Sequence, residues 1–152
     1  MSQKVLDSLH PDFRPLVVAA LAELEQTHGI KCEPYCGLRT IKEQDKEYAK
    51  GRDAKGNVIG KITTKAKGGQ SPHQFGRAVD VCPYKPHTNE LWWDAPDDIW
   101  NVIHLHFEEL GYTDDRYLDS GYDWRFRDAP HVEDPRWKED RAAYLRGELK
   151  IV

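Results

Sequence analysis

The sequence predicts one α+β domain that spans residues 1–152. Its length of 152 residues suits a single compact domain, and no internal repeat or linker divides it. Apolar residues at helical spacing indicate several helices, whereas the apolar runs that suit strands are short. Because these helices and strands do not alternate in the βαβ order of a parallel sheet, we expect the α+β class.

The composition argues against several classes of protein. Hydrophobic residues make up 39% of the chain, with five Trp and seven Tyr, so it is too aromatic for a disordered protein. No apolar run approaches the roughly 20 residues that span a bilayer, and no membrane insertion is expected. The net charge of −4 argues against a dedicated nucleic-acid binder. The first residues contain no apolar signal segment, which favours synthesis in the cytoplasm.

The first predicted helix begins at Asp12, as its cap, and runs to about His28, where Gly29 ends it. Pro15 falls in its first turn, where the missing N–H of proline is tolerated. The helix carries one apolar stripe, which consists of Phe13, Leu16, Val17, Ala20, Leu21 and Leu24.

A short strand and a second helix are expected next. The strand covers residues 30–36. Thr40 and Glu43 have the spacing of a capping box, so they open a helix that ends near Gly51. That segment, residues 52–70, has little apolar content and several glycines, which predicts a mobile loop with a short hairpin around Gly56.

The second half of the chain is expected to contain two strands and two helices. A compact strand is predicted at Ala78–Cys82, with its valines facing the core. A helix starts at Asp94, as its cap, and stops at Gly111. An irregular aromatic stretch then leads to a short strand at His131–Glu133, and a final helix covers Arg136–Leu149.

The cysteines indicate no disulfide framework. Their number is odd, and no second pair of Cys or His follows Cys32 and Cys36 at zinc-finger spacing. We expect reduced thiols that serve as small buried strand residues, and Cys82 falls in the other predicted strand.

Positive charge is concentrated in the segment Lys46–Lys67. The segment either is a solvated loop or attracts an anionic polymer, and the sequence leaves both interpretations open. Its cations are Lys46, Lys50, Arg52, Lys55, Lys61, Lys65 and Lys67, against only Glu47 and Asp53.

Two histidines, His73 and His131, lie where an irregular segment meets a short predicted strand. Two imidazoles and one carboxylate suit a zinc ion and leave a fourth position for water. His73 and Asp80 are seven residues apart, so they face the same site only if the chain turns between them, and Gly76 permits that turn. Spacing alone leaves open that each histidine is a structural or surface residue.

Two longer motifs carry a family resemblance. The pattern Ser71-x-His73-x-x-Gly76-x-Ala78-x-Asp80, followed by Asp128-x-Pro130-His131-x-Glu133, resembles the zinc peptidases of the VanY-type D-Ala-D-Ala carboxypeptidase superfamily. The sequence looks most like the phage endolysins that are L-alanyl-D-glutamate endopeptidases. The similarity covers about residues 8–134 and includes Gly37-Leu-Arg39-Thr40 with Gln44 upstream.

The resemblance implies a fold, a metal and a set of site residues. The fold is the Hedgehog/D,D-peptidase-like zinc peptidase fold, in which helices flank a small antiparallel sheet. One Zn²⁺ is held by His73, Asp80 and His131. Asp128 is the catalytic acid/base, and Arg39 resembles the arginine that faces the substrate or its tetrahedral intermediate.

Three further residues are candidates around this site. Ser71 and Gln44 fall on the matched motifs and are candidates for contact with substrate or with the site residues. Glu133 shares the strand face of His131, so its carboxylate either accepts the second N–H of that imidazole or faces solvent.

We therefore expect a zinc peptidase, an endolysin that hydrolyses the L-Ala–D-Glu bond of bacterial cell-wall stem peptides. It would act as a monomer on the wall during host lysis, without a separate wall-binding domain. A D,D-carboxypeptidase or dipeptidase acting on D-Ala-D-Ala ends is the alternative within the class. A non-catalytic wall-binding module is a more remote alternative, because a pure binder has no need of a base such as Asp128 beside the ligands.

Overall fold

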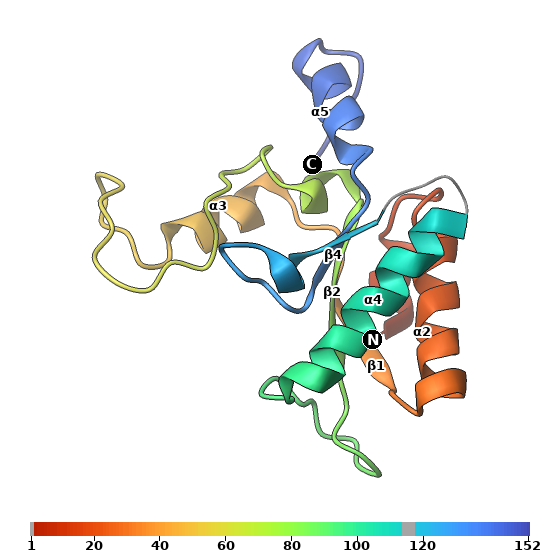
Figure 1. Cartoon of the computed structure of the whole chain (residues 1–152). Helices are drawn as coiled ribbons and strands as arrows, with labels where there is room; N and C mark the ends of the chain where they lie inside the picture. Colours follow the sequence, from red (N-terminus) through yellow and green to blue (C-terminus); the bar gives the residue numbers. More distant parts are fainter. Residues whose placement is uncertain (1, 114–117) are drawn as a thin grey trace.

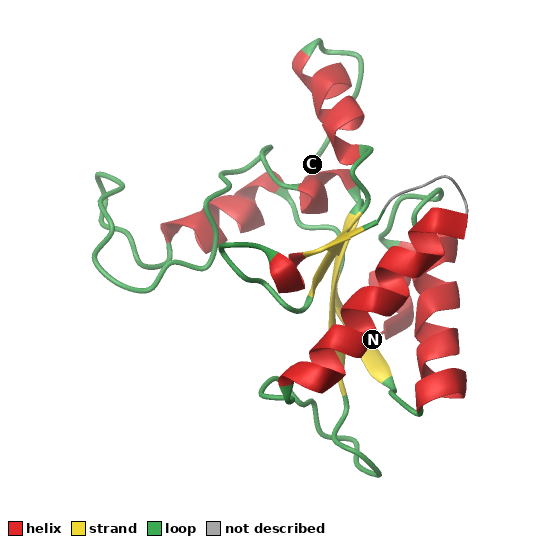
Figure 2. Cartoon of the chain, in the orientation of Figure 1, coloured by secondary structure: helices red, strands yellow, loops and turns green. Residues whose placement is uncertain are grey.

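The protein folds around a four-stranded antiparallel sheet (Figure 1). The computed structural model describes residues 2–113 and 118–152. The sheet lies near the middle of the molecule, with helices around it, which confirms the predicted α+β class (Figure 2). Its strands, in spatial order, are β1 (Cys32–Cys36), β2 (Ala78–Pro83), β4 (His131–Glu133) and β3 (Asp119–Ser120).

Two long helices cover one face of the sheet. α2 (Arg14–His28) and α4 (Asp97–Thr113) lie side by side there (Figure 1). Their apolar faces pack against the inward side chains of the strands, as alternation along a strand predicts. The buried residues shared by this core include Leu16, Val17, Ala20 and Leu24 of α2, Val79 and Val81 of β2, Trp100, Ile103 and Phe107 of α4, and Val132 of β4.

Shorter elements surround the rest of the sheet. α3 (Ile41–Ala49) lies on the side opposite α2 and α4 in Figure 1. α5 (Trp137–Leu145) packs against the 3₁₀ helix η1 (Pro72–Phe75). Within the described part of the chain, no helix is both long enough and apolar enough to cross a membrane.

Two predicted helix signals are confirmed. Thr40 and Glu43 form the capping box of α3, with each side chain accepting a hydrogen bond from the other residue's amide. Gly29 ends α2 in the left-handed conformation, with φ of 65°. The predicted cap at Asp12 is wrong, because α2 begins at Arg14 without a side-chain cap. The Asp12 carboxylate instead pairs with arginines.

Other boundaries also differ from the prediction. β1 begins at Cys32, two residues later than expected, and α5 is shorter than the predicted final helix. α4 begins at Asp97 rather than after Asp94, because its hydrogen-bond ladder starts from the carbonyl of Pro96. It continues through Gly111, since one glycine costs only about 1 kcal/mol in a helix and need not end it. Four short elements escaped prediction, namely α1 (Ser2–Asp7), η1, β3 and η2 (Gly121–Asp123).

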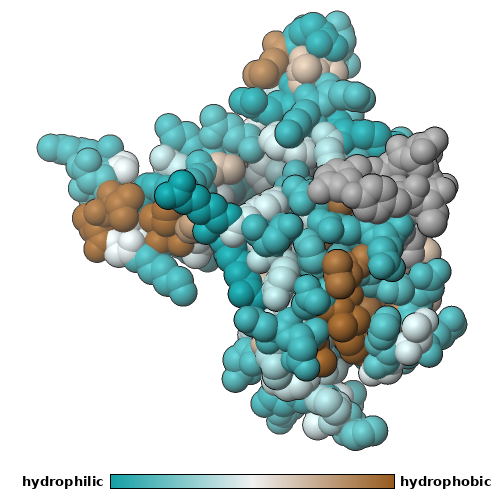
Figure 3. All heavy atoms as spheres, in the orientation of Figure 1, coloured by the Kyte–Doolittle hydropathy of each residue, from teal (hydrophilic) through white to brown (hydrophobic). Residues whose placement is uncertain are grey.

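The loop formed by residues 52–70 contains no helix, and an antiparallel bridge between Arg52 and Val58 confirms the predicted short hairpin around Gly56. Hydrogen bonds attach the second half of the loop to α3. Arg52 stacks on the Tyr48 ring and donates to the carbonyl of Thr64. Gln44 of α3 donates to the carbonyl of Ala66 at 2.8 Å. The outer end of the loop protrudes from the body of the protein and carries exposed apolar residues, Val58 and Ile59 (Figure 3).

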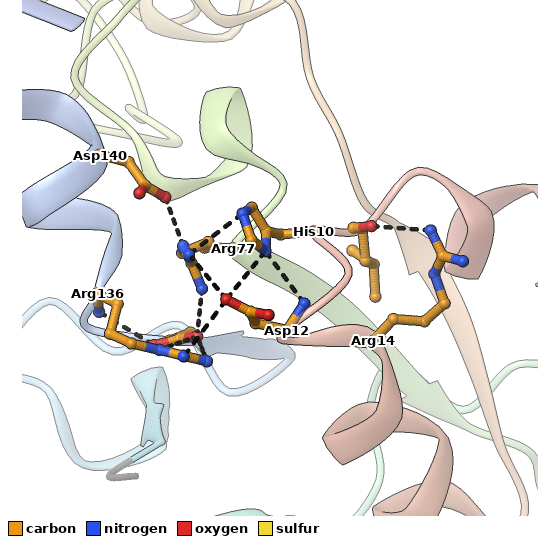
Figure 4. Close-up of polar contacts among 8 residues, drawn as sticks. His10, Asp12, Arg14, Arg77, Arg136 and Asp140 are labelled. Atoms are coloured by element: carbon orange, nitrogen blue, oxygen red, sulfur yellow. Dashed lines mark hydrogen bonds and ion pairs between the residues drawn. The ribbon is translucent and has the colours of Figure 1, made fainter. Parts of the chain in front are cut away.

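A buried ion-pair network joins the N-terminal segment, the start of β2 and α5 (Figure 4). Its centre is Arg77, which is 5% exposed and lies 2.8 Å from the carboxylate of Asp134. Arg77 also bonds Asp140 of α5 and faces His10 at 3.2 Å. The amide of Asp134 donates to the carbonyl of Arg77, so the network closes the end of the β2–β4 pairing.

We predict that the Arg77→Met substitution lowers the free energy of unfolding by about 3–5 kcal/mol at neutral pH, because it leaves Asp134 buried without one of its partners. Burial opposes ionisation of Asp134, but hydrogen bonds and charge from Arg136, with the charge of Arg77, hold its pKa below the usual value. A lowered folded-state pKa stabilises the protein above the unfolded pKa of about 3.9 and ceases to do so in stronger acid. Urea unfolding across pH should therefore show the loss shrinking below about pH 4.

The matched control is Arg146→Met, which removes an exposed ion pair with Glu148. Its effect should lie between about 0 and 1 kcal/mol. Equal effects of the two substitutions would contradict the role of the Arg77 network.

Candidate active site

The register of two strands places Asp80 directly opposite His131. Residues paired across antiparallel strands project to the same face of the sheet. The preceding pair on β2, Val79 with Val132, enters the core, so Asp80 and His131 face away from it. Residues from distant parts of the chain thereby meet on the face of the sheet that α2 and α4 leave uncovered.

The 3₁₀ helix η1 brings His73 to the same place. Gly76 ends this helix with φ of 66°, a left-handed conformation that glycine adopts without strain, and the predicted turn is confirmed. A Cβ at this position would lie 2.9 Å from the amide nitrogen of His10, so the packing also requires glycine. The Ser71 hydroxyl caps η1 by accepting a hydrogen bond from the amide of His73.

The two imidazoles converge on the Asp80 carboxylate. His73 Nε2 lies 3.6 Å from Asp80 Oδ2, and His131 Nδ1 lies 3.4 Å from Oδ1. The other ring nitrogens point outward, where His73 Nδ1 meets the carbonyl of Gly37 at 2.8 Å and His131 Nε2 meets Glu133 at 2.9 Å. When the outer nitrogens donate to these acceptors, the inner nitrogens present lone pairs to a common centre. This donor set fits a zinc ion.

Glu133 links the site to α5. Its Oε1 accepts from His131, while its Oε2 accepts from the Trp137 indole at 2.8 Å. The carboxylate is therefore held at both oxygens and is 8% exposed, which excludes the solvent-facing alternative. On the other side, the Trp124 ring packs on the imidazole of His131 with centroids 5.1 Å apart. These contacts fix the orientation of the imidazole.

Contacts within the site shift the pKa values of Asp80 and His131. Burial opposes ionisation of Asp80, but both imidazoles outweigh it and hold the pKa of this carboxyl well below its usual range. Burial likewise disfavours a charged His131, yet Asp80 and Glu133 raise the pKa of this imidazole to about 10. In the metal-free protein both ring nitrogens of His131 therefore carry a proton, and a metal ion would have to displace one of them.

Asp128 lies in the loop that precedes β4. Its amide donates to the carbonyl of Gly121 at 2.8 Å, and a Cβ on Gly121 would lie 2.2 Å from the carbonyl oxygen of Asp128. The ligand atoms of Asp80, Asp128 and His131 all lie within 4.8 Å of one another. Burial, with the nearby charge of Asp80, raises the pKa of Asp128, which makes it a better proton acceptor than an ordinary aspartate.

A cavity of about 350 Å³ opens over these groups. Ser71 and Arg39 line it, as does the loop of residues 63–66. Gln44 does not line it, because this side chain is fully buried behind Arg39. Its Oε1 accepts from the Arg39 guanidinium at 2.9 Å, so it positions that arginine and is out of reach of a substrate.

The sequence prediction missed the position of Cys36. Its Sγ lies within 4.8 Å of the ligand atoms of both His73 and Asp80. The register pairs Cys36 with Asp80 across β1 and β2, and this pairing is not visible in the sequence. Burial, followed by the charge of Asp80, raises the pKa of the thiol, so Cys36 stays protonated beside the site.

The chain is similar to known proteins in sequence. The chain matches the VanY family, described as D-alanyl-D-alanine carboxypeptidase, over residues 9–129. It is 33% identical over 126 residues to the peptidoglycan L-alanyl-D-glutamate endopeptidase CwlK of Bacillus subtilis. The matched residues make up 80% of this chain and 73% of the relative.

Solved structures share the fold. The L-Ala D-Glu endopeptidase ChiX of Serratia marcescens is 20% identical, with a TM-score of 0.65 over 91% of this chain and 89% of its own. The vancomycin resistance D,D-pentapeptidase VanY in complex with Zn(II) is 17% identical, with a TM-score of 0.59 over 91% of this chain and 79% of its own. The expected zinc-peptidase fold is thus confirmed.

We predict that His73→Ala removes bound zinc, because two remaining ligands rarely retain zinc at an open site. The measurement is metal content by inductively coupled plasma mass spectrometry after dialysis against a weak chelator. His28→Ala is the control, since His28 is exposed on α2, and it should keep one equivalent. Zinc at one equivalent in the His73 variant would refute the predicted ligand set.

Proposed function

The chain belongs to the VanY family of D-alanyl-D-alanine carboxypeptidases, and we propose that it is a zinc peptidase that hydrolyses the L-alanyl–D-glutamate bond of peptidoglycan stem peptides. The observation that carries this proposal is the convergence of two imidazoles on Asp80 beside the partly buried Asp128. The choice of bond is supported by two endopeptidases of this specificity among the similar proteins, CwlK and ChiX.

The proposed chemistry assigns separate tasks to the residues of the site. His73, Asp80 and His131 would hold one Zn²⁺, which when bound acidifies water and polarises a peptide carbonyl. Asp128 accepts the proton of the attacking water and returns it to the leaving amine of the D-glutamate. Arg39 stands at the same end of the cavity, 3.6 Å from Asp80, where its charge favours an anionic tetrahedral intermediate.

A second candidate is hydrolysis of D-Ala-D-Ala ends. It is favoured by the family as a whole and by the structural similarity to VanYB, solved in complex with D-alanine-D-alanine, at a TM-score of 0.58. The expected origin from a bacteriophage and the role in host lysis stay predictions.

The choice between the two bonds can be made with purified peptidoglycan. We predict that digestion creates new amino-terminal D-glutamate and carboxyl-terminal L-alanine, identified by mass spectrometry of the released peptides. Release of free D-alanine without new D-glutamate termini would instead establish the D,D-peptidase alternative.

We predict that Asp128→Asn lowers kcat by roughly 10²–10⁴-fold, the usual contribution of a positioned acid/base. The amide keeps the shape of the side chain but cannot accept the proton of water, so zinc content and fold should be unchanged. Asp94→Asn, at an exposed position ahead of α4, is the matched control and should keep native turnover. Near-native turnover in the Asp128 variant would assign the base role to another group.

A further inference from the structure

We propose that Lys65 binds the free carboxylate of the D-glutamate that follows the scissile bond. The inference rests on the proposed function. In stem peptides the chain continues through the side-chain carboxyl of D-glutamate, so its α-carboxylate stays free next to the nitrogen that leaves. A substrate of this kind places a negative charge close to the reacting bond, and the cavity must accommodate it.

The charges of the cavity favour a cation at some distance from the metal ligands. Its lining contains four carboxylates, on Glu47, Asp80, Asp128 and Glu133. Against these, the described lining residues with permanent positive charge are Arg39 and Lys65. A bound Zn²⁺ would offset the carboxylates around it, and a cation where the substrate carboxylate comes to rest would offset the charge of the substrate itself.

Arg39 is already committed at the metal end of the cavity. Its Nη1 donates to Gln44 at 2.9 Å, and its Nη2 faces both Cys36 Sγ and the Asp80 carboxylate. Lys65 has no carboxylate within ion-pair distance among the residues that the structure describes. Its ammonium instead lies over the ring of Phe126, 5.3 Å from the ring centroid, in a cation–π contact. Lys65 is therefore available to a ligand.

The backbone holds Lys65 at the rim of the cavity. The carbonyl of Thr64 accepts from Arg52, and the carbonyl of Ala66 accepts from Gln44. Residues 61–67 alternate between exposed and partly buried, and the exposed positions include Lys65. Lys65 thus lies between two anchored peptide groups, with an exposed side chain that lines the cavity.

The opposite side of the cavity mouth comes from the loop that carries Asp128. Phe126 and Trp124 of this loop line the cavity together with Asp128. The contact between Lys65 and Phe126 therefore spans the mouth, with Asp128 in the same cavity. A substrate carboxylate close to the leaving nitrogen meets Lys65 while that nitrogen meets Asp128.

The test compares two soluble peptides that differ in one group. One is L-Ala-γ-D-Glu-L-Lys with a free α-carboxylate, and the other carries an α-carboxamide at the same carbon. The zinc-loaded wild-type protein should cleave the carboxylate peptide with the higher kcat/KM. Lys65→Met should lower kcat/KM for this peptide roughly ten- to hundred-fold, mainly through KM, as expected for loss of a charge-assisted hydrogen bond. For the carboxamide peptide the same variant should change kcat/KM less than about two-fold, because no ion pair is lost.

Two further variants separate a specific contact from a general effect of charge. Lys61→Met removes the same charge from an exposed position of the same loop that does not line the cavity, and it should leave the carboxylate preference intact. Lys65→Arg keeps the charge and should retain most of the preference.

The outcomes separate this inference from the proposed function. If the wild-type protein cleaves both peptides and Lys65→Met changes kcat/KM equally for the two, the role of Lys65 is overturned and the proposed function stays intact. The same conclusion follows if Lys65→Met changes kcat/KM for neither peptide. An equal loss of carboxylate preference in Lys61→Met also overturns it, in favour of general electrostatic attraction. Failure of the wild-type protein to cleave either peptide overturns the proposed function and this inference with it.

Discussion

The pairing of Asp80 with His131 across β2 and β4 is the constraint on which the site depends. Because side chains alternate along a strand, a shift of one residue in this register would put Asp80 and His131 on opposite faces of the sheet and turn the valine of one strand away from the core. The apolar pair is buried under α2 and α4, so burial of hydrophobic surface indirectly holds the polar pair in place. The packing of the core thus maintains the register of β2 and β4, and the polar site residues lie on the opposite face of the sheet.

The polar groups around this pair are costly to bury and are satisfied by one another. Asp80 lies within ion-pair distance of the two imidazoles, and the outer ring nitrogens are hydrogen-bonded to Gly37 and Glu133. The Arg77 network lies at the adjoining end of the same two strands and joins them to α5. Trp137 of that helix bonds Glu133, so the C-terminal helix supports both the network and the orientation of His131.

The cavity is built from parts with different constraints. The face that carries His73, Asp80 and His131 belongs to strands and to η1, where a displacement would disturb the core. The other side is the loop of residues 52–70, which makes no contribution to the hydrophobic core. Its Arg52 donates to the carbonyl of Tyr48 in α3, and its Ala66 carbonyl accepts from Gln44 of the same helix. Such a loop can change its side chains without a change in the fold, and we infer that substrate selection is located there.

The sequence by itself determined the α+β class, the capping box of α3, the glycine turns at Gly29 and Gly76, and the motif that predicts the metal-binding and acid/base residues. These features depend on local backbone preference or on a spacing that the chain carries in its order. Only the tertiary structure decided what lies beside them. It placed Cys36 next to Asp80, buried Gln44 behind Arg39 and moved Asp12 from a helix cap to an ion-pair network. It also brought Lys65 to the cavity mouth. Strand register and the packing of a loop against a helix bring together residues far apart in the chain, and no local pattern records which residues will meet.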